Sequence, residues 1–352
     1  MLFLMFKKLY SRFSNDIGID LGTANTLVYL KGHGTVINEP SIVALNQKTG
    51  QIVAIGSEAK KMWGKTPAHI SIVRPLVEGV VSDFEITEEM LAYFIKKAEK
   101  INKKFFRPRV LIGVPSGITN VEMRAVYDAA INAGAREVFL VEEAMAAAVG
   151  VRLPVLSSSA TLVVDIGGGT TDIALIALGG IVRSLNLRVA GDHFNNRVIE
   201  YLRDEFKLLI GEQTAEQVKT TIGSAVETEY SELEVRGRDL ITGLPRALVV
   251  TDGDIREALG YPVSLLVAGI REDLETAPPE MLSYSLSSGV ILTGGGALLK
   301  GLPALLQQEL KLPIYIAEDP LSAVVRGTGI ILESFEEYKS VLLSIDDHVT
   351  VS

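Results

Sequence analysis

The chain has 352 residues and a formal net charge of -9; 47% of its residues are hydrophobic, 22% are charged and none is cysteine. These values are typical of a globular protein, and the length suits two domains. The acidic balance argues against nucleic acid as a partner, because phosphate backbones are bound by basic surfaces. The lack of cysteine excludes disulfides, thiolate metal sites and cysteine nucleophiles, and it fits a cytoplasmic protein.

The first thirteen residues have the pattern of an amphipathic helix that lies on a membrane surface. On such a helix one face is apolar and Lys7, Lys8 and Arg12 flank it. The segment is not a signal peptide, because its lysines follow the apolar run and no small-residue cleavage site appears. The alternative is a loose tail, or a strip packed on the body of the protein. The residues expected to contact lipid are Leu2, Phe3, Met5, Phe6 and Leu9.

The first half of the chain alternates strands and helices, which indicates an α/β layer. It opens with a hairpin in which an apolar strand ends at Asp20-Leu21, a turn follows, and a second apolar strand begins near Leu27. A helix is predicted over Glu85–Lys100, with Thr87 as its N-cap. The other elements expected here are strands near 35–43, 51–55, 109–114 and 137–141, and helices over 120–133, ending at Gly134, and 144–149.

The second half repeats this plan after a crossing at 153–159. A hairpin at 161–178 again has an apolar strand ending in an aspartate, Asp165, then a Gly/Thr-rich turn and another apolar strand. Two like-folded halves are therefore expected. The remaining predicted elements are helices 192–209, 214–227, 254–274, 302–310 and 321–335, a polar strand pair near 230–250, strands 288–293 and 313–316, and a Gly294-Gly295-Gly296 turn. The last helix is expected to return to the first half.

The two matching turns have the chemistry of phosphate-binding loops. Glycine permits close approach of backbone N–H groups to a phosphate, and short polar side chains add donors. One such turn alone occurs by chance in ordinary hairpins, whereas two in the same register predict a nucleotide held between two halves. The donors come from Gly22, Thr23, Ala24, Asn25 and Thr26 in the first turn, and from Gly167, Gly168, Gly169, Thr170 and Thr171 in the second.

Asp20 and Asp165 end equivalent strands beside these turns. Mg²⁺ keeps most of its waters and needs only one or two nearby carboxylates when it is bound with a polyphosphate. The sequence therefore predicts Mg²⁺ near both aspartates, held through water.

Several blocks of this chain resemble the actin, heat-shock chaperone and sugar-kinase ATPase superfamily, and within it the bacterial actin homologues of the MreB family. The likeness extends from residue 14 to residue 335. It rests on the twin hairpins and on the blocks Asp20–Thr26, Asn38–Ser41, Gly113–Thr119, Ala190–Asp192, Ile222–Ala225 and Ala317–Leu321.

The resemblance implies a slow ATP hydrolase and gives roles to further residues. Glu143 would orient the attacking water, assisted by Thr170. Glu216 and Lys219 would line an adenosine pocket. The other nucleotide-binding residues implied are Gly191, Asp192, Gly294, Gly295, Gly296 and Ala297. The chain departs from the family pattern at Ala144, where the family has proline, and at Arg326, where it has a small or apolar residue.

The resemblance also implies four subdomains in an actin-like duplicated fold, each half having a mixed β-sheet flanked by helices. After a membrane-binding segment at 1–15, subdomain IA is expected to comprise 16–33, 68–150 and 318–345, IB 34–67, IIA 151–187 and 251–317, and IIB 188–250.

A second membrane contact is expected at Phe105 and Phe106, which stand between cations in Lys103–Arg109. The alternative is a pair of phenylalanines packed in the core of a helix–strand connection. The family implies that this loop enters lipid.

The function implied is that of an ATPase that polymerises into filaments on the inner face of the cytoplasmic membrane and organises cell-wall synthesis to maintain rod shape. Its partners would be further copies of the chain, membrane lipid and membrane proteins of cell-wall elongation. Two alternatives stay open: a non-polymerising actin-like membrane adaptor, and a small-molecule kinase of the same superfamily.

Overall fold

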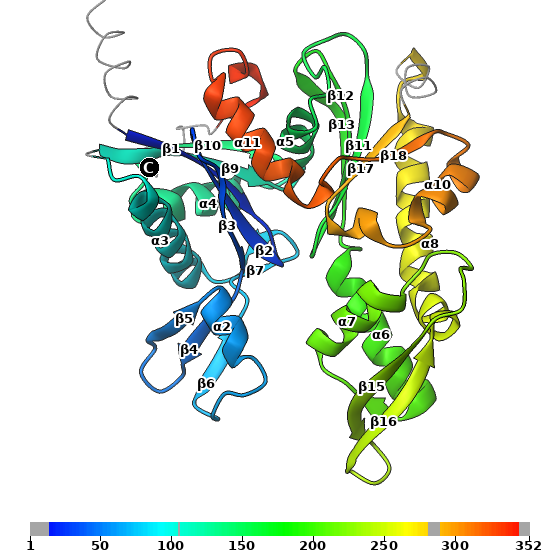
Figure 1. Cartoon of the computed structure of the whole chain (residues 1–352). Helices are drawn as coiled ribbons and strands as arrows, with labels where there is room; N and C mark the ends of the chain where they lie inside the picture. Colours follow the sequence, from blue (N-terminus) through cyan, green and yellow to red (C-terminus); the bar gives the residue numbers. More distant parts are fainter. Residues whose placement is uncertain (1–13, 105, 281–288, 345–352) are drawn as a thin grey trace, which may run out of the picture. The chain divides into compact units, whose positions relative to one another are not determined.

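A computed structural model describes residues 14–104, 106–280 and 289–344, which fall into two compact units (Figure 1). Unit 1 holds the described residues up to 158, with 176–182 and those from 322 onwards, and unit 2 holds 159–175 and 183–321. The final helix belongs to unit 1, which confirms its predicted return to the first half, whereas the division into four subdomains stays a prediction.

The main sheet of unit 1 has five strands in the order β10-β9-β1-β2-β3. β1 runs parallel to β9, and β9 runs parallel to β10, whereas β1, β2 and β3 form an antiparallel meander. The parallel strands end at the same edge of the sheet, where polar loops can gather. The strands are β1 (Ser14–Leu21), β2 (Asn25–Leu30), β3 (Gly34–Pro40), β9 (Phe106–Val114) and β10 (Glu137–Glu142).

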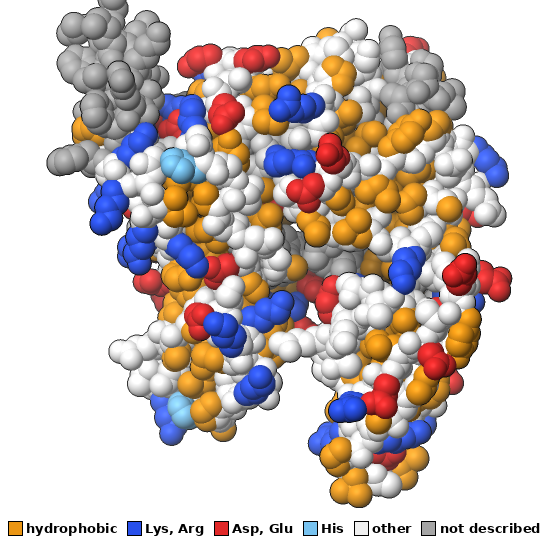
Figure 2. All heavy atoms as spheres, viewed as in Figure 1, with side chains coloured by type: hydrophobic (Ala, Val, Ile, Leu, Met, Phe, Trp, Pro, Cys, Tyr) orange, Lys and Arg blue, Asp and Glu red, His pale blue; other side chains and the backbone are white. Residues whose placement is uncertain are grey.

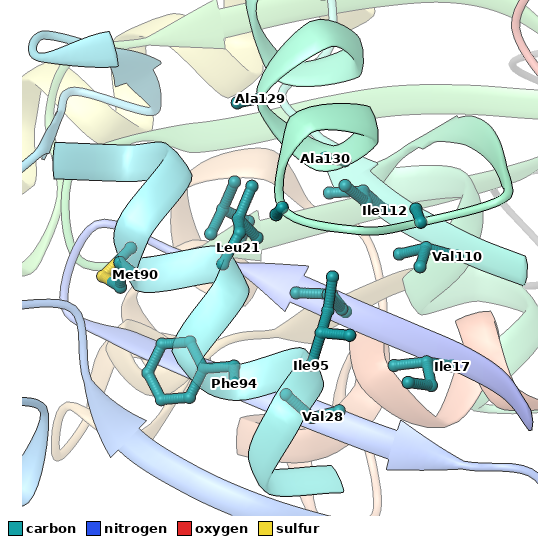
Figure 3. Close-up of a cluster of buried hydrophobic side chains, with 14 of the residues drawn as sticks. Ile17, Leu21, Val28, Met90, Phe94, Ile95, Val110, Ile112, Ala129 and Ala130 are labelled. Carbon is teal, nitrogen blue, oxygen red and sulfur yellow. The ribbon is translucent and has the colours of Figure 1, made fainter. Parts of the chain in front are cut away.

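Helices cover both faces of this sheet because successive residues of a strand point to opposite sides. Ile17 of β1 is fully buried in one core with Phe94 of α3, as Figure 3 shows. The next residue, Gly18, faces α11, where an added Cβ would lie 2.3 Å from the Thr328 hydroxyl. The helices of the unit are α2 (Ser57–Met62), α3 (Phe84–Ile101), α4 (Asn120–Asn132), α5 (Glu143–Gly150) and α11 (Ala323–Glu333).

The N-cap of α3 is Asp83, so the prediction of Thr87 is wrong. The Asp83 carboxylate accepts a hydrogen bond from the Ile86 amide. Thr87 lies one turn inside the helix, fully buried, and its hydroxyl donates to the Asp83 carbonyl. Both residue types are good caps, and the local sequence does not say which of two turns begins the helix.

Helices α5 and α11 approach each other closely because small residues line their contact. A Cβ on Gly150 would lie 1.9 Å from the Ala323 carbonyl oxygen, and one on Gly327 would lie 1.8 Å from the Ala146 carbonyl oxygen. Only glycine fits at either position at this separation. The Ala-rich sequence of α5 therefore permits the tight packing of the last helix against unit 1.

A small three-stranded sheet, ordered β5-β4-β6, packs with α2 in unit 1. Its strands are β4 (Val43–Asn46), β5 (Ile52–Ile55) and β6 (Ile70–Val73), and a two-stranded ribbon follows, formed by β7 (Leu76–Val77) and β8 (Val80–Val81). The predicted strands near 35–43 and 51–55 correspond to β3 and β5. Helix α2 and strand β6 were not predicted, because six and four residues are too short to show a clear periodicity.

Unit 2 repeats the strand order of unit 1. Its main sheet is ordered β13-β12-β11-β17-β18, and β11, β17 and β18 are parallel. Hairpin β11–β12 therefore corresponds to β1–β2, and β17 and β18 correspond to β9 and β10, which confirms the predicted duplication. The strands are β11 (Thr161–Ile166), β12 (Thr171–Ala177), β13 (Gly180–Leu187), β17 (Val290–Thr293) and β18 (Ile314–Ile316).

The helices of unit 2 lie close to their predicted ranges, but two end early. Helix α6 ends at Phe206, three residues before the predicted end at 209, and its C-cap is Lys207 with a left-handed φ of 54°. Gly223 ends α7, which was predicted to reach 227. The remaining elements are α6 (Gly191–Phe206), β14 (Leu208–Leu209), α7 (Glu212–Ile222), β15 (Glu232–Asp239), β16 (Pro245–Thr251), α8 (Asp252–Thr276), the 3-10 helix η1 (Gly295–Leu298) and α10 (Leu302–Leu310).

Replacing Phe94 with alanine is expected to destabilise unit 1 by about 3–5 kcal/mol, because it removes a fully buried aromatic ring and leaves a cavity. Urea unfolding followed by circular dichroism measures the effect. Phe84→Ala is the matched control, because Phe84 lies on the same helix and is 37% exposed. Equal destabilisation by the two substitutions would contradict the packing described here.

Candidate functional site: two phosphate hairpins

The first hairpin turn occupies residues 22–24, between β1 and β2. An added Cβ on Gly22 would lie 2.7 Å from the Asn25 carbonyl oxygen, so the turn requires glycine here. Thr23 is buried, and its hydroxyl oxygen accepts a hydrogen bond from the Gly79 amide. Thr26 is fully buried, whereas Asn25 is exposed. Of the predicted side-chain donors in this turn, Asn25 alone is exposed, and the other contacts to a ligand would come from backbone amides.

Two predicted carboxylates of unit 1 stand near the ends of β1 and β10, which flank β9 and run parallel to it. Asp20 is the last residue but one of β1 and pairs in register with Gly113 of β9, which is followed along the strand by Val114. Gly113 pairs in turn with Val141 of β10. Glu143 follows β10 directly as the first residue of α5, and it is 9% exposed. Gly113 lies on β9, the strand between the two acids. A Cβ there would lie 3.5 Å from the Glu143 side chain, so β9 places no side chain next to Glu143 at this position. Helix α5 begins at Glu143 although alanine stands where the family has proline.

The second hairpin turn is closed by a hydrogen bond from the Gly167 amide to the Thr170 carbonyl, 2.9 Å long. The glycines of this turn are half-exposed, whereas Thr170 and Thr171 are buried. The Thr171 hydroxyl donates to the Val189 carbonyl at 2.6 Å. Its side chain therefore supports the turn from inside the unit.

Asp165 is a buried acid of the second hairpin. It is 6% exposed, and its Oδ1 accepts a hydrogen bond of 2.8 Å from the Thr293 hydroxyl. Burial raises the pKa of Asp165 from its ordinary 3.8 to about 7; the Thr293 hydrogen bond lowers this pKa, and the charge of Asp172 raises it. A carboxylate in this environment would be stabilised by a nearby cation.

Helix α6 begins against the second hairpin. The Gly191 amide donates to the Gly167 carbonyl at 3.1 Å, and the Asp192 amide donates to the Gly168 carbonyl at 2.8 Å. The predicted residues Gly191 and Asp192 thus lie beside the turn. The helix also directs its positive N-terminal end towards this turn, which favours an anion.

Helix α7 adds a network of polar side chains to this region. Lys219 donates to the Gly191 carbonyl at 3.2 Å and to the Glu216 carboxylate at 2.7 Å. Asn195 donates to the same carboxylate at 2.8 Å. Sequence reasoning missed Asn195, although its place one turn beyond Gly191 on a predicted helix puts it on the same helix face.

The glycine turn after β17 packs on the end of β11. Gly294 has a φ of 77°, and a Cβ there would lie 2.3 Å from the Ile166 carbonyl oxygen and 2.7 Å from the Asp165 carboxylate. A Cβ on Gly296 would lie 2.2 Å from the Ile166 side chain. Ala297 is fully buried, so it supports this turn from behind. The predicted residues of unit 2 therefore converge at the carboxyl ends of β11 and β17.

The acids present fit a magnesium ion that is bound together with phosphates. In the described ranges no cluster of three or more His, Asp or Glu residues could hold a metal by itself. In unit 2 burial raises the pKa of the Asp165 carboxyl, so a nearby cation would stabilise its charged form. In unit 1 Asp20 is half-buried at the equivalent strand position. One or two carboxylates with water and phosphate oxygens are the usual ligands of Mg²⁺.

Most predicted lipid-contacting residues lie outside the described part of the chain: Leu2, Phe3, Met5, Phe6, Leu9 and Phe105. Phe106 begins β9 and is 39% exposed. Among the described residues, the structure has no helix whose length and apolar character would let it cross a bilayer.

In the ligand-free protein, Asp165→Asn is expected to reduce the pH dependence of stability. The pKa of Asp165 is higher in the folded chain than in the unfolded chain, so the folded state binds this proton more tightly. The contribution of the protonated Asp165 to the free energy of unfolding is complete below about pH 4 and is lost as the pH rises through about 7. Urea unfolding at about pH 5 and about pH 8 should show a smaller loss of stability in the variant than in the wild-type chain. Asp128→Asn, at an exposed salt bridge on α4, controls for the loss of one carboxylate. Parallel pH profiles for the wild-type chain and Asp165→Asn would contradict the assignment.

Comparison with known proteins places the chain among bacterial relatives. The family described as MreB/Mbl protein matches residues 14–340. The chain is similar to the cell shape-determining protein Mbl of Bacillus cereus, with 49% identity over 92% of this chain and 97% of that protein. It is 48% identical to the cell shape-determining protein MreB of Escherichia coli, over 97% of this chain and 99% of that one.

Solved structures agree with this result. MreB5 of Spiroplasma citri bound to ADP matches with a TM-score of 0.88 and 37% identity, over 92% of this chain and 98% of that one. The same protein bound to AMPPNP matches with a TM-score of 0.87 and 38% identity, over 92% of this chain and 97% of that one. The chain therefore has the actin-like fold and belongs to the MreB/Mbl family.

Proposed function

We propose that this chain is an actin-like ATPase that assembles into filaments on the inner face of the cytoplasmic membrane and organises cell-wall synthesis to maintain rod shape. The observation that carries the proposal is the duplicated hairpin. In each copy the first strand has an aspartate as its last residue but one, beside a turn whose peptide groups are held by hydrogen bonds. The relatives named as cell shape-determining proteins, and the MreB5 structures with ADP and AMPPNP, support the same reading.

The ligand of the site is ATP with Mg²⁺. The amides of the two turns bind phosphate oxygens, and the N-terminal end of α6 favours their negative charge. Glu216 and Lys219, already hydrogen-bonded to each other, contribute to the adenosine pocket with the 294–297 turn. Asp20 and Asp165 hold the Mg²⁺ through water. When bound, this ion neutralises charge on the phosphates.

Hydrolysis is an attack by water on the terminal phosphate, in line with the leaving oxygen. The protein mainly positions the reactants, as is usual for phosphoryl transfer. Glu143 accepts a hydrogen bond from the attacking water and so directs its lone pair, and Thr170 assists it. The buried position of Glu143 at the start of α5 limits the orientations that this side chain can adopt.

Glu143→Ala is expected to bind ATP with unchanged affinity and to hydrolyse it at least about a hundredfold more slowly, because only the positioning of water is lost. Calorimetry with AMPPNP and phosphate release from ATP measure the two properties. Glu142→Ala is the matched control, since this neighbouring acid ends β10 and caps α5 without a side-chain hydrogen bond to the helix. Normal turnover by Glu143→Ala would refute the role of Glu143.

Exposed hydrophobic residues support self-association. The turn between β15 and β16 carries three large apolar side chains: Leu240, Ile241 and Leu244 are 43%, 79% and 65% exposed. Hydrophobic atoms gather at this end of the strand pair in Figure 2. Exposed apolar groups of this kind mark contact surfaces with other proteins. We assign this turn to a contact between neighbouring copies in the filament.

Membrane attachment depends on many weak anchors acting together. Burying one phenylalanine of the anchor gains about 1.5–3 kcal/mol, and each nearby cation adds about 1 kcal/mol on anionic lipid. A single copy therefore binds weakly, whereas a filament that repeats the anchor binds tightly through avidity. Stable attachment to the membrane therefore requires assembly into filaments.

Deleting residues 1–13 and changing Phe105 and Phe106 to serine is expected to abolish co-sedimentation with anionic liposomes in the presence of ATP. Filaments should still form in solution, because the anchor is separate from the contacts between copies. Pelleting with and without liposomes, examined by electron microscopy, measures both properties. Full retention on liposomes would contradict the membrane role, and failure of the wild-type chain to form filaments with ATP and lipid would contradict the main proposal.

A further inference from the structure

Ser41 is the residue that most directly fixes the first phosphate hairpin from behind. It is fully buried, and it lies just beyond the end of β3. Its hydroxyl donates to the Gly22 carbonyl at 2.5 Å, and its amide donates to the Ala24 carbonyl at 3.0 Å. Because the single hydroxyl proton is used on Gly22, the bond of 2.8 Å between Ser41 and Thr26 has the Thr26 hydroxyl as donor.

A further contact reaches the same turn from Asn38. The Asn25 side-chain amide donates to the Asn38 side-chain oxygen at 3.1 Å. The segment Asn38–Ser41, which carries the family resemblance but received no role from the sequence, therefore makes four hydrogen bonds to the residues from Gly22 to Thr26 in addition to those of the β2–β3 ladder.

These bonds determine where the amides of the turn point. The peptide bond is planar, and the structure has no cis peptide bond among its described residues, so each carbonyl points opposite to the amide that follows it. When the Gly22 and Ala24 carbonyls are held on the side of Ser41, the amides of Thr23 and Asn25 are directed to the other side. Without Ser41 both peptide planes could rotate.

The segment is itself anchored through Glu39. The Glu39 carboxylate accepts hydrogen bonds from the Ser57 amide at 2.9 Å and from Lys97 of α3. Gly56 leaves room for this carboxylate, because a Cβ there would lie 2.0 Å from it. The support behind the hairpin is thus fixed to two helices, α2 and α3, and does not move freely with the turn.

We propose that Ser41 is a positioning residue for phosphate binding, which holds the amide donors of the first hairpin in their binding orientation. This inference rests on the proposed function, since it deepens the account of the same nucleotide site. Ser41 touches no ligand atom in this scheme and acts through Gly22, Ala24 and Thr26.

Ser41→Ala is expected to bind Mg²⁺-AMPPNP about tenfold more weakly than the wild-type chain, because the hydroxyl bond that holds the Gly22 carbonyl is lost together with the bond from Thr26. Calorimetry measures the affinity. For ATP hydrolysis, KM should rise by more than kcat falls.

Thr87→Val is the matched control. It also removes a fully buried hydroxyl that donates to a backbone carbonyl in unit 1, but that hydroxyl belongs to α3. It should lower the melting temperature without changing affinity.

Two further variants keep the test usable if Ser41→Ala misfolds. Asn38 is exposed, so Asn38→Ala leaves the core intact and is expected to weaken binding about twofold to threefold. Ser41→Thr keeps the hydroxyl and should recover most of the affinity lost in Ser41→Ala. If Ser41→Ala does not fold, unchanged affinity in Asn38→Ala overturns the role of the Asn38–Ser41 segment in holding the turn, and with it the proposal.

The outcomes separate this inference from the proposed function. If the wild-type chain binds no Mg²⁺-AMPPNP, the proposed function fails. If the wild-type chain binds it and the affinity of Ser41→Ala and Asn38→Ala is unchanged, the role of Ser41 alone is overturned. An equal loss of affinity in Thr87→Val would likewise overturn it, because it would show a general effect of destabilising unit 1.

Discussion

The proposed site depends on hydrogen bonds that hold the carbonyls of two turns and so direct the following amides away from the support. In unit 1 the Ser41 hydroxyl and amide hold the Gly22 and Ala24 carbonyls. In unit 2 the first amides of α6 hold the Gly167 and Gly168 carbonyls. Because peptide groups are planar, both arrangements direct the following amides away from the support. The two units thus meet one physical requirement with different groups, a serine in one and a helix terminus in the other.

The rest of each unit places these turns at the ends of buried strands. Parallel pairing brings Asp20 and Glu143 to one edge of the first sheet, with Gly113 on the strand between them. The same topology brings Asp165 and the Gly294 turn together in the second sheet. Burial at this edge raises the pKa of Asp165, and a nearby cation would stabilise its charged form.

Much of the fold could be predicted because its signals are local. The duplicated hairpins, the alternation of strands with helices and the long helix α8 follow from periodicity and turn residues. The failures were at boundaries and in short elements. Asp83 caps α3 in place of Thr87, α6 and α7 end early, and α2 and β6 were missed. Several residues near a helix end are able to cap it, so the local sequence leaves the exact boundary open by a turn.

The sequence by itself determined the chemistry available. It contains two turns rich in glycine and threonine with an aspartate before each, and a family pattern that implies roles for Glu143, Glu216 and Lys219. Tertiary structure decided which of these groups are free for a ligand. It buried Thr23, Thr26 and Thr171 as supports, left Asn25 exposed, and added Ser41 and Asn195 to the two networks. The reason is that a side chain's partners come from segments distant in sequence, and only folding brings these within hydrogen-bonding distance.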